Sequence, residues 1–435
     1  PETMWVAISP NPGVVFPAGA SPPPATAAAH GSWTVLSGPA GGAVAAARAA
    51  RSAGARQAVA LDMGGTSCDV SLVLDGRVAL TGGREVGGRS LALPMVDVHT
   101  VGAGGGSIAW RDAGGALRTG PRSAGAVPGP TCYGRGGELP TVTDANLLLG
   151  LLDAGSPLAG DVELDRAAAE RAVGRLAGEV DLSAENAAAG ILRVAGATMA
   201  QAVRVVSVER GVDPRGLALV AFGGAGPLHA AAIADELGVP RVVAPVAAGV
   251  LSALGLAVSE RRRDLVESVL LAGDTLTCAA VAAVVERLGA RGRRELAAPE
   301  AELRATYELR YAGQAFELAI EGELAPDPDE LRAAFDSAHA ERYGYSDPSA
   351  ELELVTVRVA AALGGADPRT PGAEPACRLG ERPVRFGGDW HRTPVFGPGT
   401  IATEGPAILA LPGSTLPVPP GWSARADAEA VVMER

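Results

Sequence analysis

The sequence predicts a mixed α/β protein, on three observations. Residues 57–81 alternate apolar strands with a glycine turn and an Asp75-Gly76 turn, which is typical of a β-meander. Apolar residues in 184–210 recur at helical spacing along one stripe, which indicates a long amphipathic helix. Residues 217–244 then read as buried strand, glycine turn, helix and strand, which is the order of a βαβ unit.

Start and stop signals bound the expected helices. We expect Ser183 to cap the first turn of the long helix and Gly211 to end it. A shorter helix is expected where residues 143–146, read as a cap, precede the apolar run 147–152.

Four regions are expected along the chain. Pro22, Pro23 and Pro24 forbid regular structure in the first segment. The third region is expected to hold strands near 305–311 and 317–320, a helix over 328–343 and an alternating strand at 351–359. The expected bounds are 1–31 for a poorly structured lead-in, 32–265 for a first α/β domain, 266–363 for an additional α/β module and 364–435 for a small C-terminal β-domain.

Composition excludes several classes of protein. All 37 basic residues of the 435-residue chain are arginine, so a Walker P-loop, a pyridoxal phosphate enzyme and a Schiff-base aldolase are excluded, since each needs lysine. A net charge of -12 argues against nucleic-acid binding, and the arginine clusters 261–263 and 291–294 are interpreted as solvated faces.

Location follows from the cysteines and the apolar segments. Four widely spaced cysteines favour a reducing, cytoplasmic setting. No signal peptide is recognised, and the most apolar stretch, 242–258, is interrupted by proline and glycine and is short for a membrane span. The sequence therefore predicts no membrane association.

The first glycine turn lies within LDMGGTSCDVSLV, residues 61–73. Glycines there let backbone N–H groups approach a phosphate, a threonine adds a hydroxyl, and carboxylates hold Mg²⁺ or orient a water. Solvated aspartates on an ordinary β-turn are the alternative. The candidates are Asp62 and Asp69 as catalytic carboxylates, with Gly64, Gly65, Thr66 and Ser67 around the phosphates.

A second glycine turn, FGGAGPLH at 222–229, lies between a buried strand and a helix. Gly223, Gly224 and Gly226 could let a nucleoside lie against bare backbone, whereas close packing of helix on sheet is the alternative. A strand-turn-strand for phosphates followed by a strand-glycine-helix for adenosine is the arrangement of actin-like ATPases. The predicted fold is therefore an actin-like, ribonuclease H-like core.

Several segments together resemble the hydantoinase A / 5-oxoprolinase family. The resemblance runs from residue 33 onward and is carried by SGPAGGAVAAAR at 37–48, LDMGGTSCDV from 61, VDVHTVGAGGGSIAW at 96–110, PRSAGAVPGPTCYGRGG at 121–137, PTVTDAN at 140–146, FGGAGPLHA from 222 and, more weakly, YELRYAGQAFEL, HAERYGY, GPAIL and PPGW.

The resemblance implies a subunit that uses ATP and Mg²⁺. In this family ATP phosphorylates the carbonyl oxygen of a cyclic amide so that water can open the ring. Related members belong to acetone and acetophenone carboxylases, in which a ketone enolate is phosphorylated. A B-type subunit or domain usually completes the reaction, and a hydantoin or 5-oxoproline ring is the expected substrate.

This chain departs from the family pattern in two ways. Members carry a further N-terminal domain with its own Asp-Gly-Gly-Thr motif, which forms the opposite wall of the ATP cleft and is not found in this sequence. Cys68 stands where threonine is common, with loss of a hydroxyl. We therefore expect this chain alone to bind ATP weakly and to turn nothing over, and a non-catalytic or assembly role is a third reading.

Histidines and aspartates inside these motifs suggest a second metal. Imidazole and carboxylate ligands suit Zn, Mn or Fe. Alternatively, the histidines are packed core residues and the aspartate at 144 caps a helix. Cys132 is interpreted as a structural or substrate-lining residue, because no base is paired with it. The candidate metal ligands are Asp97, His99, Asp144 and His229.

Overall fold

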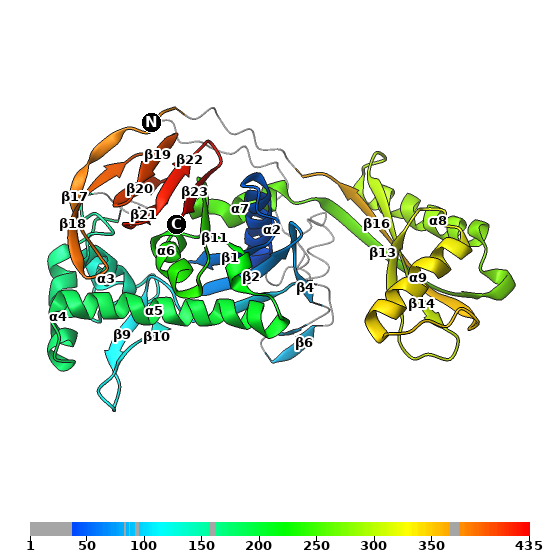
Figure 1. Cartoon of the computed structure of the whole chain (residues 1–435), viewed down its shortest axis with the longest axis horizontal. Helices are drawn as coiled ribbons and strands as arrows, with labels where there is room; N and C mark the ends of the chain where they lie inside the picture. Colours follow the sequence, from blue (N-terminus) through cyan, green and yellow to red (C-terminus); the bar gives the residue numbers. More distant parts are fainter. Residues whose placement is uncertain (1–36, 82–83, 87, 92–94, 156–161, 366–373) are drawn as a thin grey trace. The chain divides into compact units, whose positions relative to one another are not determined.

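The computed structural model describes residues 37–81, 84–86, 88–91, 95–155, 162–365 and 374–435 (Figure 1). The described residues form two compact units. The larger unit comprises 37–257 and 374–435, and the smaller unit comprises 258–365. The predicted lead-in, 1–31, lies outside the described residues.

A nine-stranded sheet is the centre of the larger unit. The predicted meander is present as antiparallel β1, β2 and β3, and the predicted βαβ unit is present as parallel β11 and β12 joined by α6. β1 also pairs in parallel with β11, and β8 pairs with β2. The bounds are β1 (Ala58–Met63), β2 (Cys68–Leu74), β3 (Arg77–Val78), β8 (Val98–Val101), β11 (Ala218–Phe222), α6 (Gly226–Leu237) and β12 (Arg241–Pro245).

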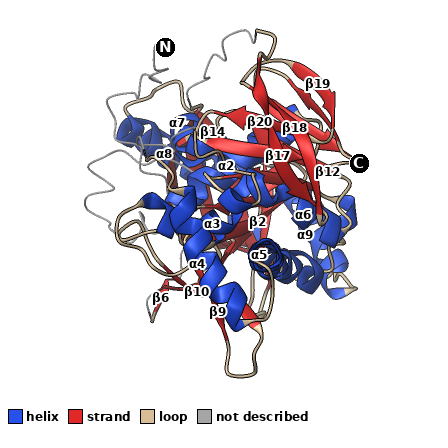
Figure 2. Cartoon of the chain, turned by 90° about the vertical axis from the view of Figure 1, so that its left-hand side faces the viewer, coloured by secondary structure: helices blue, strands red, loops and turns tan. Residues whose placement is uncertain are grey.

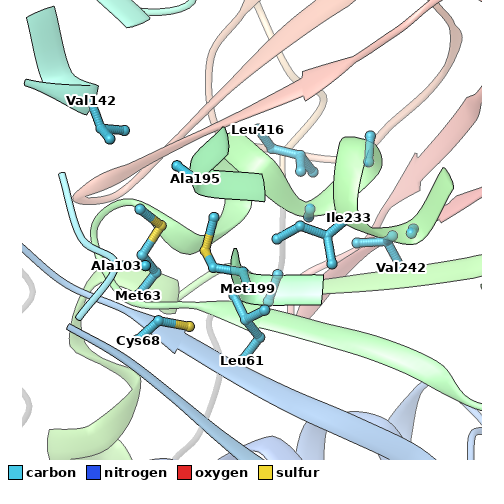
Figure 3. Close-up of a cluster of buried hydrophobic side chains, with 14 of the residues drawn as sticks. Leu61, Met63, Cys68, Ala103, Val142, Ala195, Met199, Ile233, Val242 and Leu416 are labelled. Carbon is cyan, nitrogen blue, oxygen red and sulfur yellow. The ribbon is translucent and has the colours of Figure 1, made fainter. Parts of the chain in front are cut away.

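Alternating side chains of these strands enter two different cores. Leu61, Met63 and Cys68 pack with Met199 and other apolar side chains on one face (Figure 3). On the opposite face, alanines of the N-terminal helix pack against residues such as Ala60 and Val73. The helices are α5 (Ala184–Ser207), with α3 (Val142–Leu148), α4 (Arg166–Glu179) and α6 on the first face, and α2 (Ser37–Ser52) and α7 (Leu251–Val258) on the second.

The long helix α5 begins at the predicted residue and ends one 3₁₀ turn before the predicted stop at Gly211. The Ser183 side chain accepts a hydrogen bond from the Asn186 N–H, and after a 3₁₀ turn (Val208–Arg210) the chain reverses at Gly211, with φ 75°. The segment 184–210 is long and apolar enough to span a membrane, yet half of its most apolar window is buried. Because Met199 and Val203 are fully buried, we interpret α5 as a core helix.

The start of α3 differs from the prediction. The helix begins at Val142, and Thr141 is its cap. Thr141 and Asp144 form a capping box, in which each side chain bonds the backbone N–H of the other. Asp144 therefore lies inside the first turn rather than before it.

Strands near the C-terminus follow two paths. β17, β18, β20 and β21 form a four-stranded sheet, of which Figure 2 labels β17, β18 and β20, while β19, β22 and β23 extend the nine-stranded sheet through β12. This region, predicted as a separate β-domain, thus shares the sheet of the larger unit. The bounds are β17 (Arg378–Phe386), β18 (Asp389–Phe396), β19 (Ile401–Glu404), β20 (Ala407–Leu411), β21 (Ser414–Val418), β22 (Ser423–Ala426) and β23 (Ala430–Glu434).

Three short strand pairs complete the larger unit. They are β4 (Leu80–Thr81) with β7 (Met95–Val96), β5 (Arg84–Val86) with β6 (Arg89–Leu91), and β9 (Ser107–Arg111) with β10 (Leu117–Ser123).

The smaller unit is a four-stranded sheet with two helices. Tyr307 and Phe335 are fully buried in its core. The predicted strands and helix are present, and sequence reasoning missed β13 and α8. β13 carries the first arginine cluster, where Arg263 pairs with Glu295 of α8 and is mostly buried. The bounds are β13 (Arg261–Ala272), α8 (Cys278–Leu296), β14 (Glu302–Tyr311), β15 (Leu318–Gly322), α9 (Pro328–Tyr343) and β16 (Leu352–Leu363), in the strand order β13-β16-β14-β15.

Candidate functional site

The turn between β1 and β2 brings two carboxylates together. Asp62 of β1 lies directly opposite Asp69 of β2 in the antiparallel register. Directly opposed residues share one face of the strand pair, so both carboxylates lie on the face that α2 covers. Carboxylate oxygens are the ligands that Mg²⁺ prefers, so the pair fits that ion.

The outer side of this turn is open. Gly64, Gly65 and Thr66 are exposed, and a Cβ atom built on either glycine would meet nothing within 4 Å. The Gly64 N–H donates to the Ser67 carbonyl at 3.1 Å, whereas neither Gly65 nor Thr66 donates its N–H to another backbone group of the described residues. The turn thus offers free backbone donors on an unobstructed surface.

The inner side of the turn rests on a second glycine run. Gly105 and Gly106 donate their N–H groups to the carbonyls of Gly64 and Gly65, at 3.0 and 2.6 Å. A Cβ atom at Gly104 would lie 2.5 Å from the Thr66 nitrogen, so any larger residue would push the turn away. This support uses the carbonyls of Gly64 and Gly65 as acceptors, while the N–H groups of Gly65 and Thr66 keep no backbone acceptor among the described residues.

Burial and like charge act on Asp62. Burial raises the pKa of Asp62 to about 6, with a smaller contribution from the Asp69 charge, while the hydrogen bond from Ser252 acts in the opposite direction. The Ser252 Oγ atom donates to Asp62 at 3.1 Å. Asp69 accepts a hydrogen bond from the Thr100 hydroxyl of β8 at 2.6 Å. Sequence reasoning missed both hydroxyls.

The second glycine turn meets the first. β11 runs parallel to β1 with Phe222 paired to Asp62, and the Ala225 N–H donates to the Met63 carbonyl at 3.0 Å. Gly223 has φ +80°, and a Cβ atom there would lie 2.4 Å from the Met63 oxygen and 2.5 Å from an Asp62 carboxylate oxygen. Each glycine turn therefore follows the carboxyl end of its strand, and the two strands are parallel neighbours in the sheet.

Exposure differs among the other residues of the second turn. Gly224 is exposed, and its carbonyl accepts a hydrogen bond from Ser414 at 3.3 Å. Gly226 is buried as the first residue of α6. Gly223 and Gly224 can line a ligand, whereas Gly226 serves the close packing of helix on sheet.

The four predicted metal ligands do not form one cluster. Among the described residues, no group of three or more His, Cys, Asp or Glu side chains is placed to hold a metal. Asp144 is fully buried and accepts four hydrogen bonds from Thr131, Cys132 and Thr141. Its charge is thereby used to cap α3 and to tie down the segment at 131–132.

His229 is also an interior residue. It is 4% exposed in α6, and one ring nitrogen lies 3.4 Å from the Asn146 side-chain nitrogen. Burial lowers the pKa of His229 to about 4, so its ring is neutral at pH 7. Asp97 and His99 instead line a cavity beside Arg210, and the guanidinium of Arg210 pairs with the Asp97 carboxylate.

The cysteines of these motifs are protected. Burial raises the pKa of both Cys68 and Cys132, and nearby aspartates add to the effect. Both thiols are fully buried, which keeps them protonated and unreactive. Cys68 fills the apolar core beneath the turn rather than facing a ligand (Figure 3).

Two protein-family models together match most of the chain. The hydantoinase/oxoprolinase model matches residues 19–265, and the model of the hydantoinase/oxoprolinase C-terminal domain matches residues 277–433.

Curated relatives and solved structures point the same way. Caprolactamase subunit alpha of Pseudomonas jessenii is 35% identical over 91% of this chain and 60% of its own length. 5-oxoprolinase 1 of Arabidopsis thaliana is 34% identical over 90% of this chain and 33% of its own length. Nucleotide-free acetone carboxylase superposes with a TM-score of 0.84 at 25% identity, covering 97% of this chain and 64% of that one.

The crystal structure of the P. jessenii caprolactamase superposes with a TM-score of 0.70 at 34% identity, covering 91% of this chain and 61% of that one. The chain thus spans about three fifths of the length of the first relatives it matches. Other relatives are named as subunits of acetophenone and acetone carboxylases. On these matches, the mixed α/β chain with two glycine turns at one sheet edge belongs to the hydantoinase/oxoprolinase family.

Proposed function

We propose that this chain is the nucleotide-binding part of the A-type subunit of an ATP-dependent cyclic amidase. The observation that carries the proposal is the meeting of the two glycine turns, joined by the hydrogen bond from the Ala225 N–H to the Met63 carbonyl. Ligands of α/β sheets bind beyond the carboxyl ends of the strands, where these turns lie. An actin-like core agrees with this placement, because it needs a strand-turn-strand and a strand-glycine-helix side by side.

Each part of the site has a proposed task. The free N–H groups of Gly65 and Thr66 and the Ser67 hydroxyl bind the phosphates, and Gly223 and Gly224 lie along the nucleoside. Asp62 and Asp69 would hold Mg²⁺, whose charge offsets that of the phosphate oxygens. Ser252 and Thr100 orient the two carboxylates.

The proposed reaction has two stages. The terminal phosphoryl group of ATP moves to the carbonyl oxygen of a cyclic amide, which leaves ADP and a ring carbon open to attack. Water adds to that carbon, and the C–N bond breaks as the nitrogen takes a proton, which leaves an acyl phosphate. A second water hydrolyses the acyl phosphate to a carboxylate and inorganic phosphate. This chain binds and orients the nucleotide, and a B-type partner completes the hydrolysis. Four free thiols fit a reducing compartment for the protein.

Ketone carboxylation is a second candidate, favoured by the TM-score of 0.84 with acetone carboxylase. The same phosphate site would then serve a ketone enolate, with bicarbonate as the source of the carboxyl group. The two candidates differ in the second substrate and share the nucleotide.

A phosphate-release assay separates the candidates. The chain is assembled with the N-terminal domain and the B-type subunit that the family resemblance predicts, and offered 5-oxoproline, hydantoin, caprolactam, or acetone with bicarbonate. Release with a cyclic amide supports the first proposal, and release only with ketone and bicarbonate supports the second. Asp69→Asn should abolish either activity, whereas Asp264→Asn, at an exposed carboxylate of β13, should not. Activity retained in Asp69→Asn contradicts the proposed site.

A further inference from the structure

A cavity of about 390 Å³ lies between the start of β8 and the end of α5. Asp97 and His99 line it from the β8 side, and Glu209 and Arg210 line it from the 3₁₀ turn that follows α5. Pockets for small ligands usually begin at about 300 Å³. The cavity is therefore large enough for a small organic molecule.

Charges of both signs face this cavity. Arg210 contacts the Asp97 carboxylate, yet its side chain is 41% exposed and its guanidinium has five N–H donors, so donors remain for a ligand. Glu209 is exposed and forms no ion pair with any residue in the described part of the chain. The half-buried His99 ring has no hydrogen-bond partner there either.

The cavity also has an apolar lining. Val205 and Val206 of α5 also line the cavity, and Val206 is otherwise buried. A ligand that fits must carry a negative group for Arg210, a positive group for Glu209, and a hydrocarbon part for the valines. A dicarboxylate would place one of its two charges against Glu209, and a diamine would place one of its two charges against Arg210.

We propose that this cavity binds a small amino acid in its zwitterionic form. The carboxylate lies against Arg210 and His99, the ammonium group against Glu209, and the methylene groups against the valines of α5. His99 and Thr100 are neighbours on β8 and so point to opposite faces of the sheet. Because Thr100 bonds Asp69, the cavity lies on the other face from the phosphate turn and is a separate site.

Ring opening links this site to the proposed function. Opening a neutral cyclic amide frees an amine and a carboxylate, so the product is a zwitterion of the kind that the cavity fits. The identity of the natural ligand as this product rests on the proposed function. The binding of amino acids to the cavity does not depend on the proposed function.

Calorimetric titration of the full chain tests the inference. The probes are 6-aminohexanoate and glutamate, with adipate and hexane-1,6-diamine as matched compounds that carry only one sign of charge. We expect at least one amino acid to bind, and both single-sign compounds to bind at least about tenfold more weakly. Arg210→Gln and Glu209→Gln should each weaken amino-acid binding by about tenfold or more.

Arg204→Gln is the matched control, because Arg204 lies on the same helix and pairs with Glu236 outside the cavity. It should leave amino-acid binding unchanged. The inference is overturned if neither amino acid binds, if adipate binds as tightly as 6-aminohexanoate, or if the Arg210 and Glu209 variants bind like the parent protein. Titration of the assembled enzyme with Mg-ATP reports on the phosphate turn separately, so either site can fail alone.

Discussion

Asp62 and Asp144 both lie inside the larger unit, but their surroundings are opposite. Four donors point at the fully buried Asp144. In the described part of the chain Asp62 receives a hydrogen bond from Ser252 alone and faces the second carboxylate of Asp69. The comparison teaches that the number of donors, rather than the residue type, separates a structural carboxylate from one left available to a ligand.

The same contrast holds for the backbone around each carboxylate. Three of the donors to Asp144 are the hydroxyl of Thr141, the N–H of Thr141 and the N–H of Cys132. All three hydrogen bonds are buried. Beside Asp62, the N–H groups of Gly65 and Thr66 lie in an exposed turn and have no backbone acceptor among the described residues. The carboxylate of Asp144 is fully hydrogen-bonded, whereas the turn beside Asp62 keeps backbone donors that the proposed phosphates could use.

The largest effect is expected from Asp144→Asn. An amide in place of the carboxylate sets an NH₂ group against at least one backbone N–H, so we expect the free energy of unfolding to fall by about 3 kcal/mol. Urea denaturation at pH 7 measures the change. Asp62→Asn is the matched control and should cost less than about 1 kcal/mol, since it removes a disfavoured charge. Equal losses in the two variants would contradict the comparison.

Acid should destabilise the region around His229. Its pKa is about 4 in the folded protein against 6.5 for an ordinary histidine, so only the unfolded chain takes up the proton between these values. The contribution is fully present above pH 6.5 and is lost as the pH falls toward 4, by on the order of 3 kcal/mol. Denaturation across this range should show a shallower loss in His229→Gln, and an unchanged slope would sink the idea.

Asp62 should act in the opposite direction. Its folded pKa of about 6 lies above the ordinary 3.8, so the folded protein holds this proton more tightly. The contribution is fully present below pH 3.8 and is lost as the pH rises through 6, by roughly 2 to 3 kcal/mol at most. Asp62→Asn should therefore lose more stability than the parent protein on acidification from pH 7. A parallel pH profile would show that Asp62 titrates normally.

Local patterns in the sequence predicted the elements of this site. Ser183 caps α5 as expected, and Gly211 ends the 3₁₀ turn that follows it, because capping depends on neighbours within a few residues. The meander and the βαβ unit were predicted from alternation and glycine turns, and family motifs pointed to both turns. The meeting of the two turns needs the β1–β11 pairing, which no local pattern specifies.

Partners of single residues could not be predicted in the same way. Ser252 lies 190 residues from Asp62, and its contact depends on how α7 packs. The predicted metal cluster failed for a related reason, because Asp144 draws donors from residues 12 and 13 positions earlier in the chain. The glycine run at 104–106 was a signal that could have located the support of the phosphate turn, since three small residues in succession indicate a close backbone approach.

The smallest change in stability is expected from Gly65→Ala, compared with Gly105→Ala. A Cβ atom at Gly65 meets nothing within 4 Å, so the free energy of unfolding should change by less than about 0.5 kcal/mol. At Gly105 the same atom would lie 2.8 Å from the Thr143 hydroxyl, beside Asp144, and should cost about 1 to 3 kcal/mol. Urea denaturation of the two variants measures the difference in stability between a substitution on the open outer side of the turn and one in the packed region beside Asp144.

The same two variants should differ in nucleotide binding as well. Gly65→Ala, the more stable of the two, should show a loss of nucleotide binding that does not come from a loss of stability. The methyl group that Gly65→Ala adds occupies the surface where the proposed phosphates approach the N–H groups. The substitution should therefore weaken Mg-ATP binding about tenfold or more in the assembled enzyme and leave the fold intact. Any loss of binding in Gly105→Ala should instead accompany its loss of stability. If Gly65→Ala binds Mg-ATP as tightly as the parent protein, the open side of the turn is not where the phosphates lie.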